Sequence, residues 1–231
     1  MRKILYFSAC LTALMVFLLL VGNAVADSPQ PLPANIVAAW EKAGAQFFWM
    51  ASSGLRDPDA NGQSGDIPAF YFRQWPADFS QLPQPDQSFG ILSGGIKIPD
   101  SGLEELSGFV HLTKLVLIDT QITDAGLKGL SSLTHLQTLN LYGSSVSDAG
   151  LEGLAGLTQL QTLVLDNTQV TDAGMKQLAG LKQLHVLTLS NTKMTDAGLM
   201  PLAGLEQLQI LNLNSTHVTD VGLQQLASLK H

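Results

Sequence analysis

The sequence is short of cysteine and of charge, and each shortage excludes a class of protein. Cys10 is the single cysteine among 231 residues, so a disulfide-stabilised scaffold is excluded. Charged residues make up 13% of the chain, and acidic side chains outnumber basic ones to give a net charge of −7. We therefore expect no nucleic-acid partner, because phosphate binding needs a basic surface. The length suffices for one domain with its own apolar core.

The sequence also lacks the motifs of the common enzyme classes. It contains no G-x-S-x-G, no H-E-x-x-H and no phosphate-binding glycine loop. The five histidines fall at surface or turn positions of the repeats described below. We therefore expect neither catalysis nor a bound organic cofactor.

The start of the chain (1–26) has the order of a secretory signal peptide. A basic start (1–3) precedes an apolar run (4–22), and positions 24–26 supply the small side chains of a cleavage site. Cleavage there would remove Cys10 and leave a secreted, periplasmic or cell-envelope protein without membrane attachment. The apolar run is also nearly long enough to span a bilayer, so an uncleaved membrane anchor is the alternative.

From position 88 onward the chain repeats itself with a 24-residue period. Each unit follows the pattern L-x-x-L-x-L-x-x-T-x-V-T-D-A-G-L, with small variations. The first leucines of the five units are Leu112, Leu136, Leu160, Leu184 and Leu208. A partial copy precedes them, so the segment 88–231 divides into one partial and five 24-residue units. A period of this length is typical of solenoid repeats.

The pattern inside a unit predicts a strand followed by a helical turn. L-x-L places two leucines on one face of a strand, and the later three-residue spacing of Leu127, Leu130 and Leu133 is typical of a helix or 3₁₀ helix. A single unit cannot bury its own leucines, so neighbouring units must stack. We expect an α/β solenoid with short parallel strands on its concave face and helices on its convex face, closed by an N-terminal cap of helix and strand.

Two polar columns and one proline add local detail to this prediction. Asp124 and its equivalents stand where a carboxylate can cap the helical turn. Thr120 and its equivalents follow the strand, and we expect their hydroxyls to bond backbone groups of the adjacent turn. We interpret both columns as structural. Pro201 falls within the outer helix of the fourth unit and predicts an irregular segment there.

The T-x-V-T-D-A-G-L motif resembles the 24-residue leucine-rich repeats that are abundant in planctomycete bacteria. It is similar to the ribonuclease-inhibitor-like and cysteine-containing repeat classes. The resemblance covers Gly90 to His231. It implies a helical outer face and a role in protein–protein interaction, and it brings no catalytic residues with it.

The segment 27–87 is the expected linker and cap. Asp27–Pro33 is rich in proline and predicts an extended, mobile linker. Asn35 can cap a helix, and the segments 46–50 and 69–72 are predicted strands. The tryptophans all precede the repeats. We expect them to pack over the end of the leucine core, with an aromatic ligand-binding cluster as the alternative.

The segment 57–62 matches the opening D-x-D-x-N-G of a calcium loop, in which alternate side-chain oxygens converge on the ion. Pro68 stands where the bidentate glutamate would be, so Asp66 could serve only in a shortened loop. The candidate ligands are Asp57, Asp59, Asn61 and Asp66. The same residue types also form ordinary exposed turns, so calcium is one of two interpretations.

Strand residues between the buried leucines should point to the concave face, where we place the candidate ligand-binding residues. They are Val116, Ile118, Asn140, Tyr142, Val164, Asp166, Asn167, Asn191, Asn212 and Asn214. The later units present amides and hydroxyls, and the earlier ones present a small apolar area. This mixture favours a neutral, hydrogen-bonding ligand such as a peptide, a protein or a glycan, and a merely solvated surface is the alternative.

The last unit predicts a further contact surface. With no following unit, the side of the fifth repeat would leave its leucines partly uncovered and a strand edge open, which favours weak self-association. The leucines concerned are Leu211, Leu213, Leu223 and Leu226. We therefore expect an exported, non-catalytic module for protein–protein interaction. The alternative is a calcium-dependent or glycan-binding cell-surface structural protein.

Overall fold

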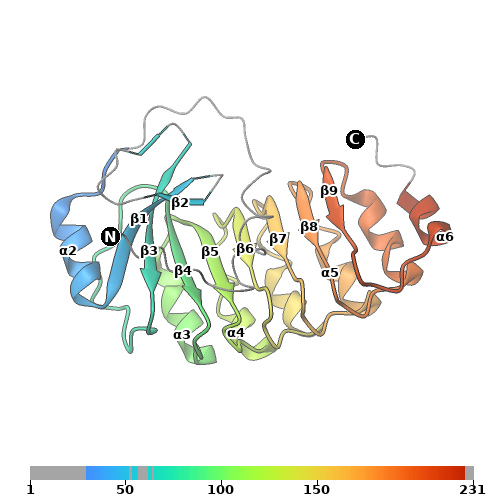
Figure 1. Ribbon diagram of the computed structural model, residues 1–231, viewed down its shortest axis with the longest axis horizontal. Coiled ribbons are helices and arrows are strands. Elements are labelled where there is room, and N and C mark those ends of the chain that lie inside the picture. Colours follow the sequence, from blue (N-terminus) through green and yellow to red (C-terminus); the bar gives the residue numbers. More distant parts are fainter. Residues whose placement is uncertain (1–29, 52–53, 57–61, 64, 227–231) are drawn as a thin grey trace, which may run out of the picture.

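The computed structural model describes residues 30–51, 54–56, 62–63 and 65–226. The predicted signal peptide (1–26), with its alternative as a membrane anchor, lies outside these ranges. The described part forms one curved molecule that begins just before α2 and ends just beyond α6 (Figure 1).

Within the described residues, nine strands form one sheet in the order β2-β1-β3-β4-β5-β6-β7-β8-β9. The strands are β1 (Ala45–Ala51), β2 (Gly54–Arg56), β3 (Ile67–Phe72), β4 (Phe89–Gly94), β5 (Leu112–Ile118), β6 (Thr138–Asn140), β7 (Thr162–Val164), β8 (Val186–Thr188) and β9 (Ile210–Asn212). β1 pairs antiparallel with β2 and β3, and all later pairs are parallel. The two strands predicted at 46–50 and 69–72 are confirmed as β1 and β3.

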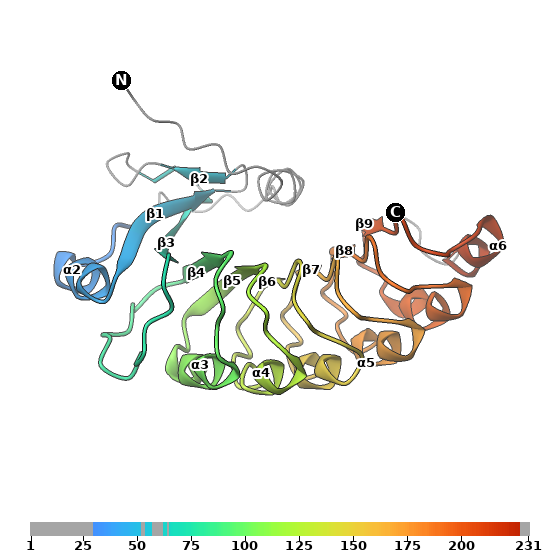
Figure 2. The same ribbon diagram turned by 60° about the horizontal axis from the view of Figure 1, so that its bottom comes forward.

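Short helices follow the strands of the repeats on the opposite layer. The α-helices are α2 (Ala34–Lys42), α3 (Asp100–Glu104), α4 (Asp124–Lys128), α5 (Met175–Leu178) and α6 (Asp220–Leu223). The 3₁₀ helices are η1 (Glu105–Gly108), η2 (Gly150–Leu154), η3 (Asp172–Gly174), η4 (Asp196–Gly198), η5 (Met200–Gly204) and η6 (Gln224–Leu226). Figure 2 shows the strands along the inner side of the curve and the helices along its outer side. The predicted α/β solenoid is confirmed.

The core is a continuous stack of leucines. Strands β5 to β9 pair so that equivalent positions of successive repeats lie side by side, as in Lys114 with Thr138 and Thr138 with Thr162. The inward-facing leucines at the middle of four successive strands are fully buried, and these are Leu115, Leu139, Leu163 and Leu187. Because burying one leucine contributes about 1.5–3 kcal/mol, the contact between neighbouring units supplies most of the stabilisation of each.

The aromatic side chains of the N-terminal segment close the first end of this stack. Trp40 of α2 is fully buried and stacks on Phe70 with ring centroids 4.2 Å apart. Phe89 and Phe109 also contact its ring, and its indole N–H donates to the Pro83 carbonyl at 2.9 Å. These contacts join α2 to β3 and to the first repeat, as a cap requires.

Two predictions for the start of the chain were wrong. Asn35 is the second residue of α2 and does not cap it, because the helix begins directly after Pro33, whose carbonyl accepts the Ile36 N–H at 2.9 Å. The predicted linker also contributes to the core, since Leu32 is buried there.

The parallel sheet begins earlier than the repeated sequence. β3 pairs parallel with β4, as in Ala69 with Gly90, and this step along the chain is shorter than the period of the repeats. The segment expected only to cap the solenoid therefore supplies a strand to it. Its different length and its aromatic residues hide this strand from a search for the leucine pattern.

Pro201 lies in a short 3₁₀ helix, η5, which confirms the irregular outer segment predicted for the fourth unit. The proline is not required for this geometry, however. The second unit has a 3₁₀ helix of the same length at Gly150–Leu154 without any proline. The short outer segment is therefore a property of the repeat, in which the next strand must begin soon after the turn.

Candidate binding face

The aspartates at the position of Asp124 were predicted to cap the helical turn of their own repeat, and this was wrong. They instead accept hydrogen bonds from the next repeat. The cap is the preceding threonine, as at η4, where the Thr195 hydroxyl accepts the Ala197 N–H at 3.3 Å. The carboxylate of Asp172 accepts the backbone N–H of Thr195 at 2.8 Å and its hydroxyl at 2.6 Å. We call this pair of bonds the aspartate clamp. It occurs in Asp100–Thr123, Asp124–Ser147, Asp148–Thr171, Asp172–Thr195 and Asp196–Thr219.

The aspartate clamp accounts for the column of carboxylates by hydrogen bonds between repeats. Both oxygens of each clamp carboxylate are engaged by hydrogen-bond donors of the neighbouring unit. At Asp196 the backbone N–H and hydroxyl of Thr219 hold the pKa of the carboxyl below its ordinary value. The column is structural, as predicted, but it acts between repeats.

The hydroxyl column was also predicted to bond the adjacent turn, and this was wrong. The Thr168 hydroxyl donates to the carbonyl of Leu165 at 2.6 Å, within its own repeat, and Thr192 and Thr216 do the same. These three hydroxyls therefore each close a loop within their own repeat. Among the described residues, the hydroxyls of Thr120 and Ser144 are buried and have no hydrogen-bond partner.

The apolar residues predicted for the concave face lie on that face but are covered. Val116, Ile118 and Val164 are 2%, 5% and 5% exposed. Val116 and Ile118 pack with Met50 and Leu92 in a second, smaller apolar cluster, separate from the leucine stack. Val116 and Ile118 thus pack against the N-terminal cap, and the predicted apolar residues do not form an open apolar area.

The polar residues of the same face are more accessible. Asn191 and Asn214 are exposed, and Tyr142, Asp166, Asn167 and Asn212 are half-buried. Asn140, by contrast, is fully buried. The accessible part of the predicted site therefore lies towards the later repeats.

Part of the hydrogen-bonding capacity of these side chains is used within the protein. The Asp166 carboxylate accepts the Ser190 N–H at 2.6 Å, and the Asn140 side-chain oxygen accepts the Tyr142 N–H at 2.9 Å. The Asn191 amide donates to the Asn167 side-chain oxygen. These bonds fix the side chains, so the face presents an ordered polar surface.

Two charged groups define the electrostatics of the concave face. Burial raises the pKa of Asp166, although the hydrogen bond from the Ser190 N–H opposes the change. Lys114 stands two positions before Val116 on β5, and burial lowers its pKa while the charge of Asp66 opposes this. The sequence reasoning missed Lys114, although the period of two along a strand places it on the same face as Val116.

The predicted calcium ligands are only partly within the described residues. Asp57, Asp59 and Asn61 lie outside them. Asp66 is buried, forms an ion pair with Arg56 at 3.1 Å and accepts the Gln63 N–H at 2.9 Å. In the part of the chain that the structure describes, no group of three or more His, Cys, Asp or Glu side chains could hold a metal ion.

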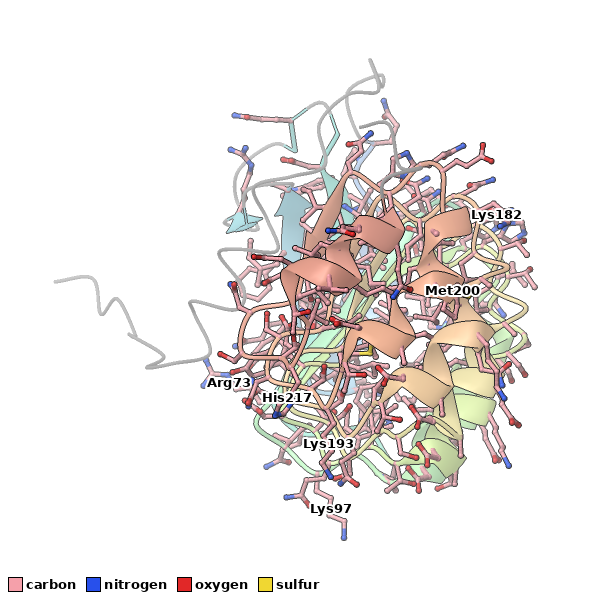
Figure 3. All side chains as sticks on the ribbon, turned by 90° about the vertical axis from the view of Figure 1, so that its right-hand side faces the viewer. Arg73, Lys97, Lys182, Lys193, Met200 and His217 are labelled. Carbon is pink, nitrogen blue, oxygen red and sulfur yellow. The ribbon has the colours of Figure 1, made fainter. Side chains whose placement is uncertain are left out.

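The C-terminal end of the solenoid exposes apolar side chains, as predicted. Of the four predicted leucines, Leu223 is 47% exposed, and Leu211, Leu213 and Leu226 are half-buried. Val221, which was not predicted, is 70% exposed, and β9 is the edge strand among the described residues. Figure 3 looks along the stack from this end. In that view Lys97, Lys193 and His217 fall on one edge, because they occupy equivalent positions of their repeats. All three side chains are exposed.

Comparison with known proteins agrees with this geometry. Two family models match, both described as leucine-rich repeat: one at residues 110–131 and 132–155, and the other at residues 158–218. These segments are leucine-rich repeats. No curated protein matches the chain.

Solved structures of leucine-rich-repeat proteins also match. An internalin from Listeria monocytogenes is 26% identical with a TM-score of 0.50, over 62% of this chain and 39% of the internalin chain. This chain therefore spans well under half of that internalin. An internalin C2 from the same species is 23% identical with a TM-score of 0.47, over 90% of this chain and 88% of that one. A search of the described residues for helices found none long and apolar enough to span a membrane.

Proposed function

We propose that this protein is an exported, non-catalytic module that binds another protein or a peptide on the concave face of its leucine-rich repeats. The observation that carries the proposal is the ordered polar surface of the later repeats, where Tyr142, Asp166 and Asn191 are accessible. Leucine-rich repeats generally mediate protein–protein interaction, and the match to an internalin fold is consistent with such a role.

The composition of the face supports a protein or peptide ligand. Its accessible groups are amides, hydroxyls, the Asp166 carboxylate and one tyrosine. The polar groups can form hydrogen bonds to a peptide backbone, and the tyrosine ring can bury apolar area while its hydroxyl stays polar. The net charge of −7 argues against nucleic acid as the ligand. The narrower resemblance to planctomycete repeats stays a prediction.

The test is affinity capture from the native cell-envelope fraction, followed by measurement of the dissociation constant for the captured protein. A variant carrying both Tyr142→Ala and Asn191→Ala is expected to bind at least tenfold more weakly. Glu152→Ala on the outer helix η2 is the matched control, because Glu152 is exposed on the convex side. Unchanged affinity in the double variant, or an equal loss in the control, would remove the concave-face assignment.

Export is tested separately by the mass of the processed chain. We expect cleavage after Ala26, so that the secreted or periplasmic product begins with Asp27. A chain that keeps the segment 1–26 and fractionates with the membrane would support the anchor instead.

We also propose weak self-association through the C-terminal end. Val221 and Leu223 present an apolar area beside the edge strand β9. Light scattering over a hundredfold range of concentration should show a rising average mass, and Val221→Lys should abolish the rise. A mass that stays at the monomer value throughout would contradict this proposal.

A calcium-dependent surface role is the second candidate. The loop at 57–62 keeps its calcium-like sequence, whereas Asp66 is engaged by Arg56. Calcium at millimolar concentration should raise the melting temperature if the loop binds the ion, and chelator should reverse the rise. Identical melting curves in both conditions would end the calcium hypothesis.

A further inference from the structure

Three hydrogen-bond donors without partners lie together on the concave face. Lys114 on β5 is in register with Thr138 on β6, which is in register with Thr162 on β7. Asn140 stands two positions after Thr138, so it lies on the same face between the outer two strands. Lys114, Asn140 and Thr162 therefore occupy neighbouring positions on three adjacent strands.

Two of these donors, those of Asn140 and Thr162, are buried and unpaired within the described residues, and Lys114 is half-buried. The side-chain nitrogen of Asn140 and the hydroxyl of Thr162 have no hydrogen-bond partner there, and the two residues are 0% and 2% exposed. The orientation of the Asn140 amide is set, because its oxygen accepts the Tyr142 N–H at 2.9 Å. Its nitrogen is thus held as a donor without an acceptor.

The ammonium group of Lys114 is in a similar position. Within the described residues it has no carboxylate at ion-pair distance. Burial lowers the pKa of Lys114, and the charge of Asp66 opposes this from beyond that distance. The Asp66 carboxylate is already engaged by Arg56 at 3.1 Å and by the Gln63 N–H at 2.9 Å. A half-buried charge without a partner is costly, and such groups concentrate at functional sites.

We propose that this donor cluster binds a carboxylate group of the peptide or protein ligand, with Lys114 as the charge partner. This inference rests on the proposed function and adds to it the chemistry of the ligand. Lys114 supplies up to three N–H donors, Asn140 two and Thr162 one. Lys114 is half-buried, so a ligand carboxylate contacts its ammonium group first, and it reaches the buried donors of Asn140 and Thr162 only as the side chains that cover them move aside.

The charges nearby favour an anion with one negative charge. The pair of Arg56 and Asp66 is neutral as a whole, which leaves one positive charge at Lys114. Asp166 follows β7 along the chain and disfavours a dianion such as phosphate. Val116 and Val164 flank Asn140 in the sheet, so the surroundings are apolar and strengthen a charge-assisted hydrogen bond.

The test uses the full chain, immobilised, and three soluble libraries of N-acetylated random heptapeptides. The first contains Asp and Glu and has an amidated C-terminus. The second lacks acidic residues and is amidated, and the third lacks acidic residues but keeps its C-terminal carboxylate. Retained peptides are identified by mass spectrometry. We expect at least tenfold more retention from a library that carries a carboxylate, and the first and third libraries separate a side chain from a chain terminus as its source.

Variants then assign the preference to the cluster. Lys114→Met should abolish the preference and raise the melting temperature, because it removes an unpaired, half-buried charge. Lys128→Met is the matched control, since Lys128 is exposed on the outer helix α4. If Lys114→Met does not fold, Thr162→Val replaces it, with an expected weakening of at least threefold for a retained acidic peptide and no effect on its amide counterpart.

Equal retention from all three libraries, or a preference that persists in Lys114→Met or Thr162→Val, would overturn the inference. Retention of acid-free amidated peptides that is lost in Tyr142→Ala would overturn it and leave the proposed function intact. Retention from no library would also overturn it, and the capture experiment above would then decide the proposed function independently.

Discussion

One position in each unit, within three residues of the end of the strand, has a left-handed backbone. The residues there are Asp119, Gly143, Asn167, Asn191 and Ser215, with φ between 53° and 66°. Asp, Asn and Gly tolerate this conformation best, because their side chains are short or absent. The five units have four different residue types at this position. The left-handed backbone that they share could therefore not be predicted from the sequence.

At this position the second unit has Gly143, and two features of its surroundings favour glycine. Its φ is +66°, and a Cβ there would overlap the carboxylate oxygen of Asp119. We expect Gly143→Ala to lower the free energy of unfolding by about 1–3 kcal/mol, measured by urea denaturation. Gly180→Ala is the control, because a Cβ at Gly180 meets nothing within 4 Å. A cost that is equal in the two variants would show that the left-handed turn is not the cause.

Asp166 gives a prediction that depends on pH. Burial raises its pKa in the folded protein above the unfolded value of about 3.9, so ionisation opposes folding, and this penalty grows as the pH rises through the interval between the two values. Asp166→Asn keeps an oxygen for the Ser190 N–H and removes the charge. The variant should be more stable than the wild type at pH 7 and no more stable at pH 3, by urea denaturation at both pH values. A gain of equal size at pH 3 would contradict the assignment.

At the scale of the element, the alternation of leucines predicted the strands of the repeats and the burial of their leucines. It could not predict the aspartate clamp, because the bonded partner of Asp172 belongs to the next repeat and the carboxylate fits a local cap equally well. Nor did the alternation show that Val116 and Val164 are covered while Asn191 is open. Exposure depends on what packs over the face, and the repeat pattern does not contain that information.

The aspartate clamp predicts a difference between two substitutions of one residue. Thr195→Val removes the hydroxyl that caps η4 and bonds Asp172, and we expect a loss of about 1–2 kcal/mol. Thr195→Ser keeps the hydroxyl and should stay within about 0.5 kcal/mol of the wild type, as Ser147 serves in the equivalent place. Thermal or urea unfolding measures both. Equal losses would mean that the methyl group, not the hydroxyl, matters.

At the scale of the whole molecule, each unit is stabilised by packing against the unit beside it. The tryptophans were predicted to cover the first open face of the stack. Trp40 confirms this with contacts to rings of β3, β4 and the first outer segment, and Trp75 packs against the same core, whereas Trp49 lies outside that cluster. The paired strand β3 could not be predicted as part of the parallel sheet, because its shorter step to β4 breaks the period. The repeats are therefore predictable from sequence, and the cap is predictable only in outline.

Trp40→Ala should lower the free energy of unfolding by about 3–5 kcal/mol, because it empties a fully buried aromatic site. In a one-dimensional stack this loss acts first on the nearest units. Amide hydrogen exchange should show a larger drop in protection in β4 and β5 than in β8. Equal loss in all strands would indicate that the solenoid unfolds as one cooperative body.

The bond between each carboxylate and the following unit has a consequence for how such a chain can change in length. The same pair of donors joins each repeat to the next. The addition or removal of one complete repeat would therefore leave every contact between neighbouring repeats with its hydrogen bonds intact. Unequal recombination within the gene would thus yield longer or shorter proteins that still fold, each with a binding surface of a new size.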